Sequence, residues 1–513
     1  MFFDDALVAS KELEITLTGK SCGLEERAPM CGIPYHAVEG YLSKLVSRGY
    51  KVAICEQVED PKLAKGLVKR EVIRVVTPGT NLNVQSLEAG KNNYLLSIVC
   101  VPHARGISAG EGAPVDYYVP EVENLNKLSD GLMVYVPSAI ICNEAFLVSG
   151  FDVNDLKTRL HISVNALESH MFDDNGCRRI LMKHFKVNTL IGLGVEEFPT
   201  GLLAAGALLQ YLYDTQKTDL EHFTHIYPYL TSKYMLLDSS TRRNLELTET
   251  LREKQKRGSL LWVLDKTKTA MGARLLRNYI EQPLIEKDEM EKRLDAIQEL
   301  NQDSISRDEI REYLNPIYDL ERLLSKVTYK TANPRDLIAF RNSLEMLPPI
   351  KTVLAAFEKE ELVEIREQID GLEDIYQLID EAIIEEPPIS IREGGMIKDG
   401  FDETIDRLRS AKHDGKQWLA QLEEEDRERT GIKNLKIKYN KVFGYYFEVT
   451  NSYKDLVPED YIRKQTLANA ERYTTPRLKE LEDTILNAED KLQTLEYDVF
   501  CKIRDTIAQA LVS

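Results

Sequence analysis

The carboxyl-terminal segment of the chain, residues 476–513, carries apolar residues at spacings that alternate between three and four. The repeat is formed by Leu478, Leu481, Ile485, Ala488, Leu492, Leu495 and Val499. Such a heptad pattern lays apolar side chains along one narrow stripe of a helix, and a second helix must cover that stripe. The sequence therefore predicts a long helix here and another long helix beside it.

The partner helix is predicted upstream, over residues 401–422. Its apolar positions are Phe401, Ile405, Leu408, Trp418, Leu419 and Leu422. Between the two helices lie the β-branched and aromatic runs LKIKY, NKVFG and YYFEVT, with turn residues at Asn440 and Gly444, which is typical of a β-hairpin. We therefore expect a β-rich module inserted at the tip of a two-helix arm.

The amino-terminal part of the chain reads as two α/β domains. Residues 1–90 mix short helical patterns with the strand-like runs KVAIC and EVIRVV, closed by the turn TPGT. Strand-like runs such as YLLSIVCV then alternate with helical stretches, which predicts a sheet covered by helices over residues 91–232. Farther on the apolar spacing becomes mostly helical, so residues 233–430 are expected to form an all-α region.

Composition narrows the class of protein. The chain has 513 residues and a net charge of −18, from Lys+Arg 66 against Asp+Glu 84, which excludes a surface covered with phosphate contacts. Residues 358–386 contribute twelve acids against Lys359 and Arg366 and read as a solvated helical surface. No apolar run reaches the roughly 18 residues of a membrane span, and the amino terminus has no export signal. We expect a cytoplasmic protein with no membrane partner.

Motifs of nucleotide-binding and hydrolytic enzymes occur only in incomplete form. Gly19-Lys20-Ser21 ends like a phosphate-binding loop, but Glu14 stands where that loop needs its first glycine, so we interpret the segment as a turn. The stretch from Gly106 to Gly110 matches the G-x-S-x-G nucleophile pattern once. Because it lacks the flanking strand and helix signals, we predict a flexible loop there. The sequence predicts no catalytic residue.

The cysteines give no indication of a metal or a disulfide framework. Seven cysteines are scattered without any C-x-x-C pair. Cys100 and His103 have the spacing of metal ligands, but no second pair completes a set of four. We expect reduced, mostly buried thiols and neither a metal nor a cofactor in this chain.

Local positive charge runs against the acidic balance of the chain in three segments. These are residues 62–74, with five basic residues against one acid, residues 242–277, with ten against four, and residues 430–480, with ten against six. In the first two segments we favour solvated faces and helix pairs. The third interleaves its charges with tyrosines, phenylalanines and amide donors, a pattern that fits backbone contact with nucleic acid. Because aromatics in a hairpin are usually part of its core, we interpret most of these aromatic residues as packing.

Several segments resemble, in order, the bacterial MutS family of DNA mismatch-repair proteins. The runs MCGIPYHAV (30–38), VAICEQ (52–57) and VIRVVTPGT (72–80) are similar to the mismatch-binding domain of that family. DSSTRRNLE (238–246) resembles the start of its core domain, and KQTLANAERY (464–473) resembles its clamp. The resemblance covers nearly the whole chain in the family's domain order.

The resemblance implies names and boundaries for the predicted parts. These are a mismatch-binding domain at 1–90, a connector at 91–232, the core with the first lever helix at 233–430, the clamp at 431–480 and the second lever helix at 481–513. The family acts as a homodimer that kinks duplex DNA at a mismatch, uses ATP and Mg²⁺, and recruits a MutL-type partner. A weakly paired site is easier to kink, so the family can recognise a mismatch by the deformability of the DNA.

The resemblance also implies which residues meet DNA. The clamp is expected to contact the DNA backbone without base specificity, through Lys441, Lys464, Gln465, Asn469 and Arg472. Met30, Pro34, Tyr35 and His36 resemble a wall of the mismatch-binding domain, although turn and core roles fit them as well. The family's mismatch-reading Phe-x-Glu segment would precede Met1, and its ATPase domain would follow Ser513. We therefore expect a chain that is truncated at both ends, clamps DNA and does not hydrolyse ATP.

A second class of function stays open from the residues alone. A non-enzymatic α-helical scaffold that docks a partner protein fits the net charge of −18 and the acidic segment 358–386. Salt dependence discriminates the two, because contacts to phosphates release counterions and contacts between proteins depend on salt far less.

Overall fold

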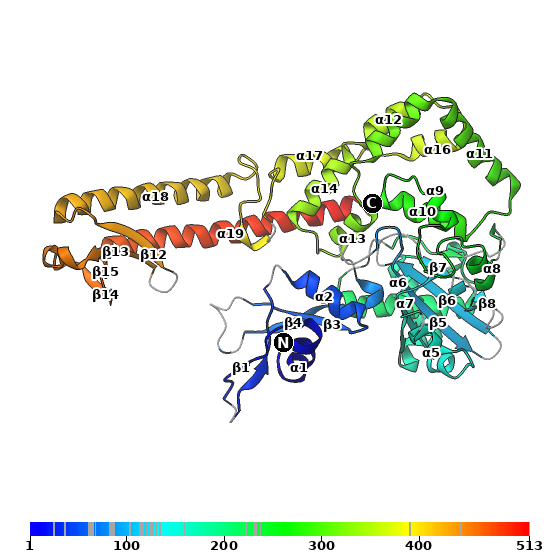
Figure 1. Ribbon diagram of the computed structural model, residues 1–513, viewed down its shortest axis with the longest axis horizontal. Coiled ribbons are helices and arrows are strands. Elements are labelled where there is room, and N and C mark those ends of the chain that lie inside the picture. Colours follow the sequence, from blue (N-terminus) through cyan, green and yellow to red (C-terminus); the bar gives the residue numbers. More distant parts are fainter. Residues whose placement is uncertain are drawn as a thin grey trace. The chain divides into compact units, whose positions relative to one another are not determined.

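A computed structural model gives the fold of the chain (Figure 1). The structure describes residues 1–23, 26–34, 37–59, 66, 68–81, 88–101, 104–111, 117–119, 121–122, 128–129, 131–132, 135–158, 160–218, 220, 223–228, 233–235, 237–388, 391–440 and 444–511. The chain divides into a first unit, residues 1–332, 339–376 and 505–513, and a second unit, residues 333–338 and 377–504. The predicted change from mixed α/β structure with small sheets to a largely helical core is confirmed.

Two short helices and two hairpins form the amino-terminal part of the first unit. Their bounds are α1 Phe3–Leu13, β1 Thr18–Lys20, β2 Ala28–Met30, α2 Val38–Ser47, β3 Val52–Gln57 and β4 Arg70–Val76. Both strand pairs, β1 with β2 and β3 with β4, are antiparallel. Ala6, Ala9 and Leu13 of α1 pack with Cys31 and Leu45, since the apolar spacing of α1 places these side chains on one face.

A larger sheet follows, in the order β10-β9-β5-β6-β7-β11, in which β7 spans Tyr117–Val119, β10 spans Ser163–Ala166 and β11 spans Tyr227–Pro228. Its main strands are β5 Tyr94–Val101, β6 Ala104–Glu111 and β9 Ala139–Cys142, with β5 antiparallel to β6 and parallel to β9. Leu95 and Leu96 of β5 belong to separate buried clusters. Because successive strand residues point to opposite faces, the sheet is buried on both sides. Helices α6 Asp174–His184 and α7 Pro199–Gln216 belong to one of these faces (Figure 1).

The prediction of a flexible loop at residues 106–110 was wrong, because these residues lie inside β6. A Cβ on Gly106 would stand 2.1 Å from the carbonyl oxygen of Thr200 in α7. The glycine therefore permits close contact between helix and strand, and it does not signal flexibility. Ser108 is buried within the strand, which agrees with the interpretation that it is not a nucleophile.

Short helices make up the rest of the first unit and its border with the second. They are α8 Ser239–Asn244, α9 Leu260–Leu264, α10 Ala270–Glu281, α11 Lys287–Gln302, α12 Ser304–Leu314, α13 Leu320–Thr328, α14 Pro334–Leu344, α15 Leu347–Leu354, α16 Glu360–Gln368 and α17 Glu373–Ala382. Side chains of Asp238, Ser259, Thr269 and Asp319 accept first-turn N–H groups of α8, α9, α10 and α13. Such caps satisfy donors that the helix itself leaves unpaired.

Two buried arginines of this helical region hold the main chain at residues 88–91. Arg322 donates from Nη2 to two carbonyl oxygens of this segment, at 3.0 and 3.1 Å. Arg274 donates to a third carbonyl at 3.1 Å and binds both carboxylate oxygens of Asp319 at 2.7 Å. Charge-assisted bonds of this kind are stronger than neutral ones, so residues 88–91 are fixed to α10 and α13.

The second unit contains most of two long helices, α18 Glu403–Thr430 and α19 Pro476–Ala510. The predicted heptad positions of α19 are buried or half-buried, and Leu419 and Leu422 of α18 share a core with Leu478 and Ile485. A Cβ on Gly415 would stand 2.6 Å from Cγ1 of Ile485. The glycine lets the two helices approach closely at that point.

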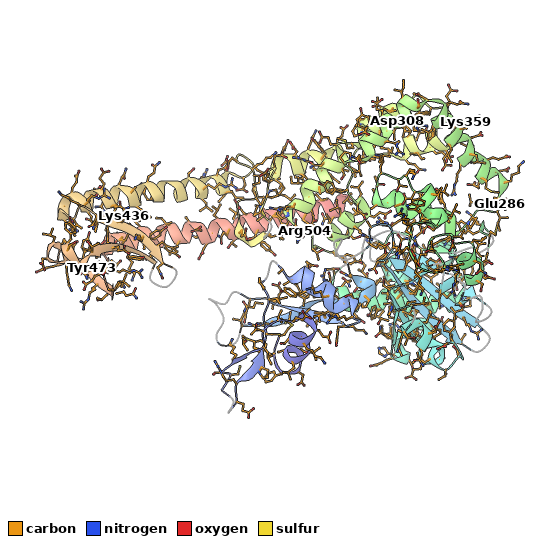
Figure 2. All side chains as sticks on the ribbon, in the orientation of Figure 1. Glu286, Asp308, Lys359, Lys436, Tyr473 and Arg504 are labelled. Carbon is orange, nitrogen blue, oxygen red and sulfur yellow. The ribbon has the colours of Figure 1, made fainter. Side chains whose placement is uncertain are left out.

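A four-stranded antiparallel sheet, here called the inserted sheet, lies between α18 and α19 in the sequence. Its strands are β12 Lys436–Asn440, β13 Gly444–Thr450, β14 Ile462–Thr466 and β15 Ala470–Thr474, in the order β12-β13-β15-β14. Phe447, Val449 and Tyr473 pack with Leu422 and Leu478 of the helices. Figure 2 shows Lys436 and Tyr473 on this sheet.

No helix in the described part of the chain is long and apolar enough to span a membrane.

Candidate nucleic-acid interface

The inserted sheet carries four of the five predicted clamp residues, and Lys441 lies outside the described residues. Lys464 is exposed on β14, and Asn469 is exposed in the turn between β14 and β15. Gln465 and Arg472 are half-buried and face each other across these two strands. The structure thus places Lys464, Gln465, Asn469 and Arg472 on the hairpin formed by β14 and β15.

Arg472 is held in place by its neighbours on the sheet. Its Nη1 donates to Oε1 of Gln465 at 2.7 Å, and its guanidinium carbon lies 4.5 Å from the ring centroid of Tyr446. Its Nε is buried without a hydrogen-bond partner among the described residues. A guanidinium fixed by an amide and a ring presents its remaining N–H groups in one orientation. Gln465 is therefore a positioning residue for Arg472.

The same hairpin carries a buried carboxylate. Glu471 is 3% exposed, accepts a hydrogen bond from Nζ of Lys454 at 2.8 Å and also binds the hydroxyl of Tyr473. The bond from Lys454, followed by that from Tyr473, lowers the pKa of Glu471. Burial, followed by the bond to Glu471, raises the pKa of Tyr473 to about 12. Arg463 lies 3.7 Å from the same carboxylate, so Lys454 and Arg463 share one negative charge.

Two other lysines are better placed to meet a phosphate. Within the part of the chain that the structure describes, neither Lys436 nor Lys464 has an ion pair. Lys438, two residues after Lys436, is bound to Glu448 at 2.7 Å. Lys436 was not among the clamp residues predicted from sequence. The signal for it was its alternation with Lys438, which places both side chains on the same face of β12.

Most aromatic residues of the sheet pack in its core, as one of the two sequence interpretations held. Tyr446, Phe447, Tyr461 and Tyr473 are buried, whereas Tyr439 is half exposed. The rings of Tyr439 and Tyr445 lie 5.0 Å apart. The aromatics therefore form the core of the module, and its exposed polar residues remain for contact with a ligand.

The structure describes two of the four residues predicted as a wall of the mismatch-binding domain. Met30 lies in β2, half-buried, where its carbonyl oxygen accepts the hydroxyl of Thr18 at 2.9 Å. Pro34 is exposed, and its carbonyl oxygen accepts the N–H of Ala37 at 3.0 Å. Tyr35 and His36 lie outside the described residues. Met30 and Pro34 thus have local structural contacts.

The phosphate-loop motif is not built as a nucleotide site. Gly19 and Lys20 lie in β1, which pairs with β2 in an antiparallel hairpin. A phosphate loop leads instead into a helix whose first N–H groups face the nucleotide. Among the described residues, no group of three or more His, Cys, Asp or Glu side chains is arranged to hold a metal ion. Cys100 is buried in β5, and His103 lies outside the described residues.

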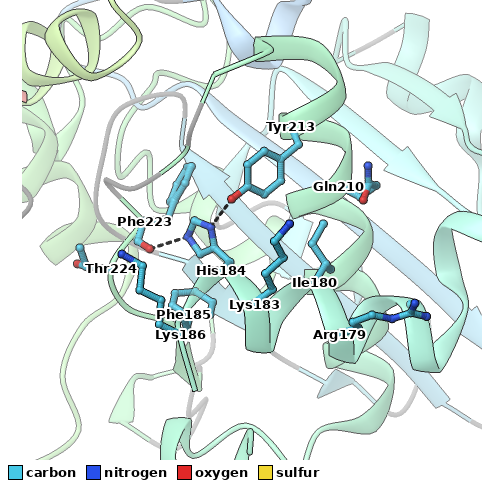
Figure 3. A pocket seen from close by; sticks show the side chains of 11 residues that line it. Arg179, Ile180, Lys183, His184, Phe185, Lys186, Gln210, Tyr213, Phe223 and Thr224 are labelled. Atoms are coloured by element: carbon cyan, nitrogen blue, oxygen red, sulfur yellow. Dashed lines mark hydrogen bonds between the residues drawn. The ribbon is translucent and has the colours of Figure 1, made fainter. Parts of the chain in front are cut away.

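A cavity of about 750 Å³ beside α6 and α7 was not indicated by the sequence (Figure 3). Its central His184 lies 2.8 Å from the hydroxyl of Tyr213 through Nδ1 and 2.8 Å from the carbonyl oxygen of Phe223 through Nε2. Because a carbonyl only accepts, Nε2 carries a proton, and in the neutral ring Nδ1 accepts from Tyr213. Both nitrogens are engaged, so His184 fixes α6 to α7 and residue 223 and is not a free base.

Comparison with protein-family models gives three matches that together span most of the chain. Residues 1–85 match MutS domain I, residues 93–224 match MutS domain II, and residues 240–513 match MutS domain III. The inserted sheet and the two long helices lie within the third match.

Curated relatives agree with these matches. The DNA mismatch repair protein MutS of Lachnoclostridium phytofermentans is 65% identical over 99% of this chain and 55% of its own length. Those of Ruminiclostridium cellulolyticum and Acetivibrio thermocellus are 52% and 50% identical over 100% of this chain and 58% and 59% of their own lengths. The chain thus spans somewhat more than half the length of the relatives that it matches.

Proposed function

This chain belongs to the MutS family of DNA mismatch repair proteins, and on that premise we propose that its inserted sheet acts as a clamp that binds duplex DNA. The contacts are to the sugar–phosphate backbone and do not depend on base sequence. In this proposal α18 and α19 are the lever helices that carry the clamp.

The observation that carries the proposal is the exposure of Lys436 and Lys464 on one small module. They lie on the two outer strands of a four-stranded sheet, so roughly 14 Å separates their strands at about 4.8 Å per strand. This span covers several phosphates of one DNA strand. Asn469 adds an amide donor on the same hairpin as Lys464, and Arg472 adds oriented N–H groups. Lys441 completes the set carried over from the family resemblance.

The acidic balance of the chain is compatible with this function. A net charge of −18 repels DNA over most of the surface, so attraction must come from a local group of cations whose charges are not already compensated. Lys436 and Lys464 come nearest to this requirement because they form no ion pair with a described residue, whereas Lys438, Lys454 and Arg463 do. Binding by so few phosphate contacts is weak at physiological salt and steeply dependent on salt concentration.

The other activities of the family are not part of the function proposed for the inserted sheet. We propose that ATP hydrolysis with Mg²⁺, homodimer formation and recruitment of a MutL-type partner are functions of the longer relatives and not of the described residues. We also propose that discrimination of a mismatch does not reside in the inserted sheet. Backbone contacts are the same at every base pair, so the module alone binds matched and mismatched duplex equally.

The test is fluorescence anisotropy of the whole chain with a matched duplex and a single-mismatch duplex, each over a salt series. The expected result is equal, steeply salt-dependent binding to both. Replacement of Lys441, Lys464, Gln465, Asn469 and Arg472 by Ala should remove it. Unchanged duplex affinity of this variant at low salt would refute the assignment of the clamp. A partner captured with no dependence on salt would favour the protein-docking scaffold instead.

A further inference from the structure

A cleft in the first unit, away from the inserted sheet, has the size and charge of a small-molecule site. Its volume is about 510 Å³, and its lining comes from residues 91–94, 135–136 and 160 and from residues 240–281, which include α8 and α10. Pockets of roughly 300–1,000 Å³ are usual for bound small molecules. The cleft is therefore large enough for a ligand of nucleotide size.

Positive charge dominates the lining. Two carboxylates, Glu249 and Glu281, face a set of six cations, Lys91, Arg242, Arg243, Lys254, Arg274 and Arg277. Arg274 is compensated by Asp319 and Glu321 outside the cleft. Lys91 is likewise paired with Glu88 outside the cleft, at 2.9 Å. Four cations thus remain against two carboxylates, and this excess favours an anionic ligand.

Three of these cations have N–H donors that no described residue accepts. Arg243 and Lys254 are exposed and form no ion pair with any described residue. Arg277 lies 3.3 Å from Glu281 through Nη1, but its Nε is buried with no acceptor in the described part of the chain. A buried donor without an acceptor costs free energy. Arg243 and Lys254 are therefore the cations best placed to bind acceptor oxygens of a ligand.

The loop that bears Lys254 adds hydroxyl donors to the same wall. Thr248 and Thr250 line the cleft, and the N–H of Thr250 donates to the carbonyl oxygen of Gln255 at 3.0 Å, which closes the loop. Lys254 has a φ of 49°, a left-handed conformation that is uncommon outside glycine. Such strained positions concentrate at binding sites, where the fold holds a side chain toward a ligand.

We propose that this cleft binds a small phosphate-bearing anion, either an inorganic diphosphate or the phosphates of a nucleotide. Lysine and arginine side chains with nearby hydroxyl groups are the donors that bind phosphate oxygens. A cavity of this volume holds a small molecule and not a duplex. The site is independent of the DNA contact of the inserted sheet, and either assignment stands if the other fails.

The test is isothermal titration calorimetry of the full chain with inorganic pyrophosphate and, in a second arm, with ADP, both in buffer without Mg²⁺. Saturable binding is expected, weakened about tenfold or more in Arg243→Ala/Lys254→Ala. Tighter binding of ADP assigns the site to a nucleotide, and equal or tighter binding of pyrophosphate assigns it to inorganic diphosphate. Both side chains are exposed, so the variant should fold, which circular dichroism checks.

A matched control removes one arginine and one lysine from exposed positions elsewhere, in Lys287→Ala/Arg407→Ala. This control should bind pyrophosphate and ADP as the unmodified chain does. The proposal is overturned if neither ligand saturates at millimolar concentration, or if the control and the cleft variant lose affinity equally. It is also overturned if the cleft variant loses duplex DNA affinity in parallel, since the cations would then belong to a nucleic-acid surface.

Discussion

The carboxylate of Glu496 on α19 and the guanidinium of Arg409 on α18 form an ion pair, with Oε1 and Nη2 2.5 Å apart. Glu496 is 0% exposed, and its other oxygen accepts the N–H of Gly395. Arg409 also donates to the carbonyl oxygen of Ile397 at 2.6 Å. One acidic side chain thus joins both long helices to the segment that precedes α18.

Removal of this carboxylate should destabilise the second unit. Glu496→Ala leaves a partly buried guanidinium, and we expect the free energy of unfolding to fall by about 3 kcal/mol, because Arg409 keeps Asp399 as a partner. Urea unfolding followed by Trp418 fluorescence, in a Trp262→Phe background, measures the change. Glu403→Ala, which removes an exposed pair with Arg407, should cost less than about 1 kcal/mol. Equal losses in the two variants would contradict the role of Glu496.

The same substitution should have opposite effects at two helical glycines of the first unit. A Cβ on Gly206 in α7 would stand 2.3 Å from Cβ of Cys177, whereas a Cβ on Gly40 in α2 would meet nothing within 4 Å. Gly206→Ala should therefore lower stability by about 1–3 kcal/mol through overpacking. Gly40→Ala should raise it by up to about 1 kcal/mol through helix propensity. Thermal unfolding by circular dichroism distinguishes the two, and stabilisation by Gly206→Ala would show that α6 and α7 are not so close.

The inserted sheet should lose stability in acid through Glu471. Its pKa is lowered in the folded protein from an ordinary value of 4.5, so the unfolded chain takes up the proton first as the pH falls. The contribution of Glu471 is therefore fully present above pH 4.5 and is lost as the pH falls through the folded pKa. Urea midpoints between pH 7 and pH 3, read from Trp418 in the Trp262→Phe background, should fall less steeply in Glu471→Gln. Parallel pH profiles would exclude this carboxylate as the cause.

Removal of single charges from the inserted sheet should reduce the salt dependence of DNA binding in equal steps. Each lost phosphate contact lowers the slope of log K against log salt concentration by about 0.9. Lys464→Ala and Lys436→Ala should each show this reduction, with equal effects on matched and mismatched duplexes. Lys438→Ala removes a charge that Glu448 already compensates, so its slope should change little. A larger effect at Lys438 than at Lys436 would overturn this ranking.

The long-range architecture was predictable where a repeat imposed it. The apolar stripe from Leu478 to Val499 required a partner helix, and the change to aromatic and β-branched residues between the helices indicated a sheet. The glycines at 106–110 were misread, because their pattern is the same in a mobile loop and in a strand that touches a helix. Only the close approach of Thr200 in the folded chain distinguishes the strand from a loop.

The candidate interface was predictable in composition but not in detail. The sequence indicated a basic, aromatic-rich module, yet it did not tell a compensated cation from an uncompensated one. That distinction depends on side-chain geometry in the folded sheet: the register sets Lys436 opposite Glu448 and Lys438 opposite Tyr446, yet Glu448 forms its ion pair diagonally, with Lys438. Gln465 stays a predicted DNA contact, and the register also makes it a support for Arg472, which the sequence did not indicate.

The hydrogen bonds from Arg274 and Arg322 to residues 88–91 affect where the chain can be cut into separate domains. The family matches end at residue 85 and resume at residue 93, so alignment presents this stretch as an unassigned gap and an obvious place to cut. In the folded chain the stretch belongs to the helical region, because its carbonyl oxygens accept hydrogen bonds from two buried guanidinium groups. An excised first or second domain would carry away a strip of backbone that the third domain needs for its own stability. Dissection of this protein should therefore leave residues 88–91 attached to α10 and α13.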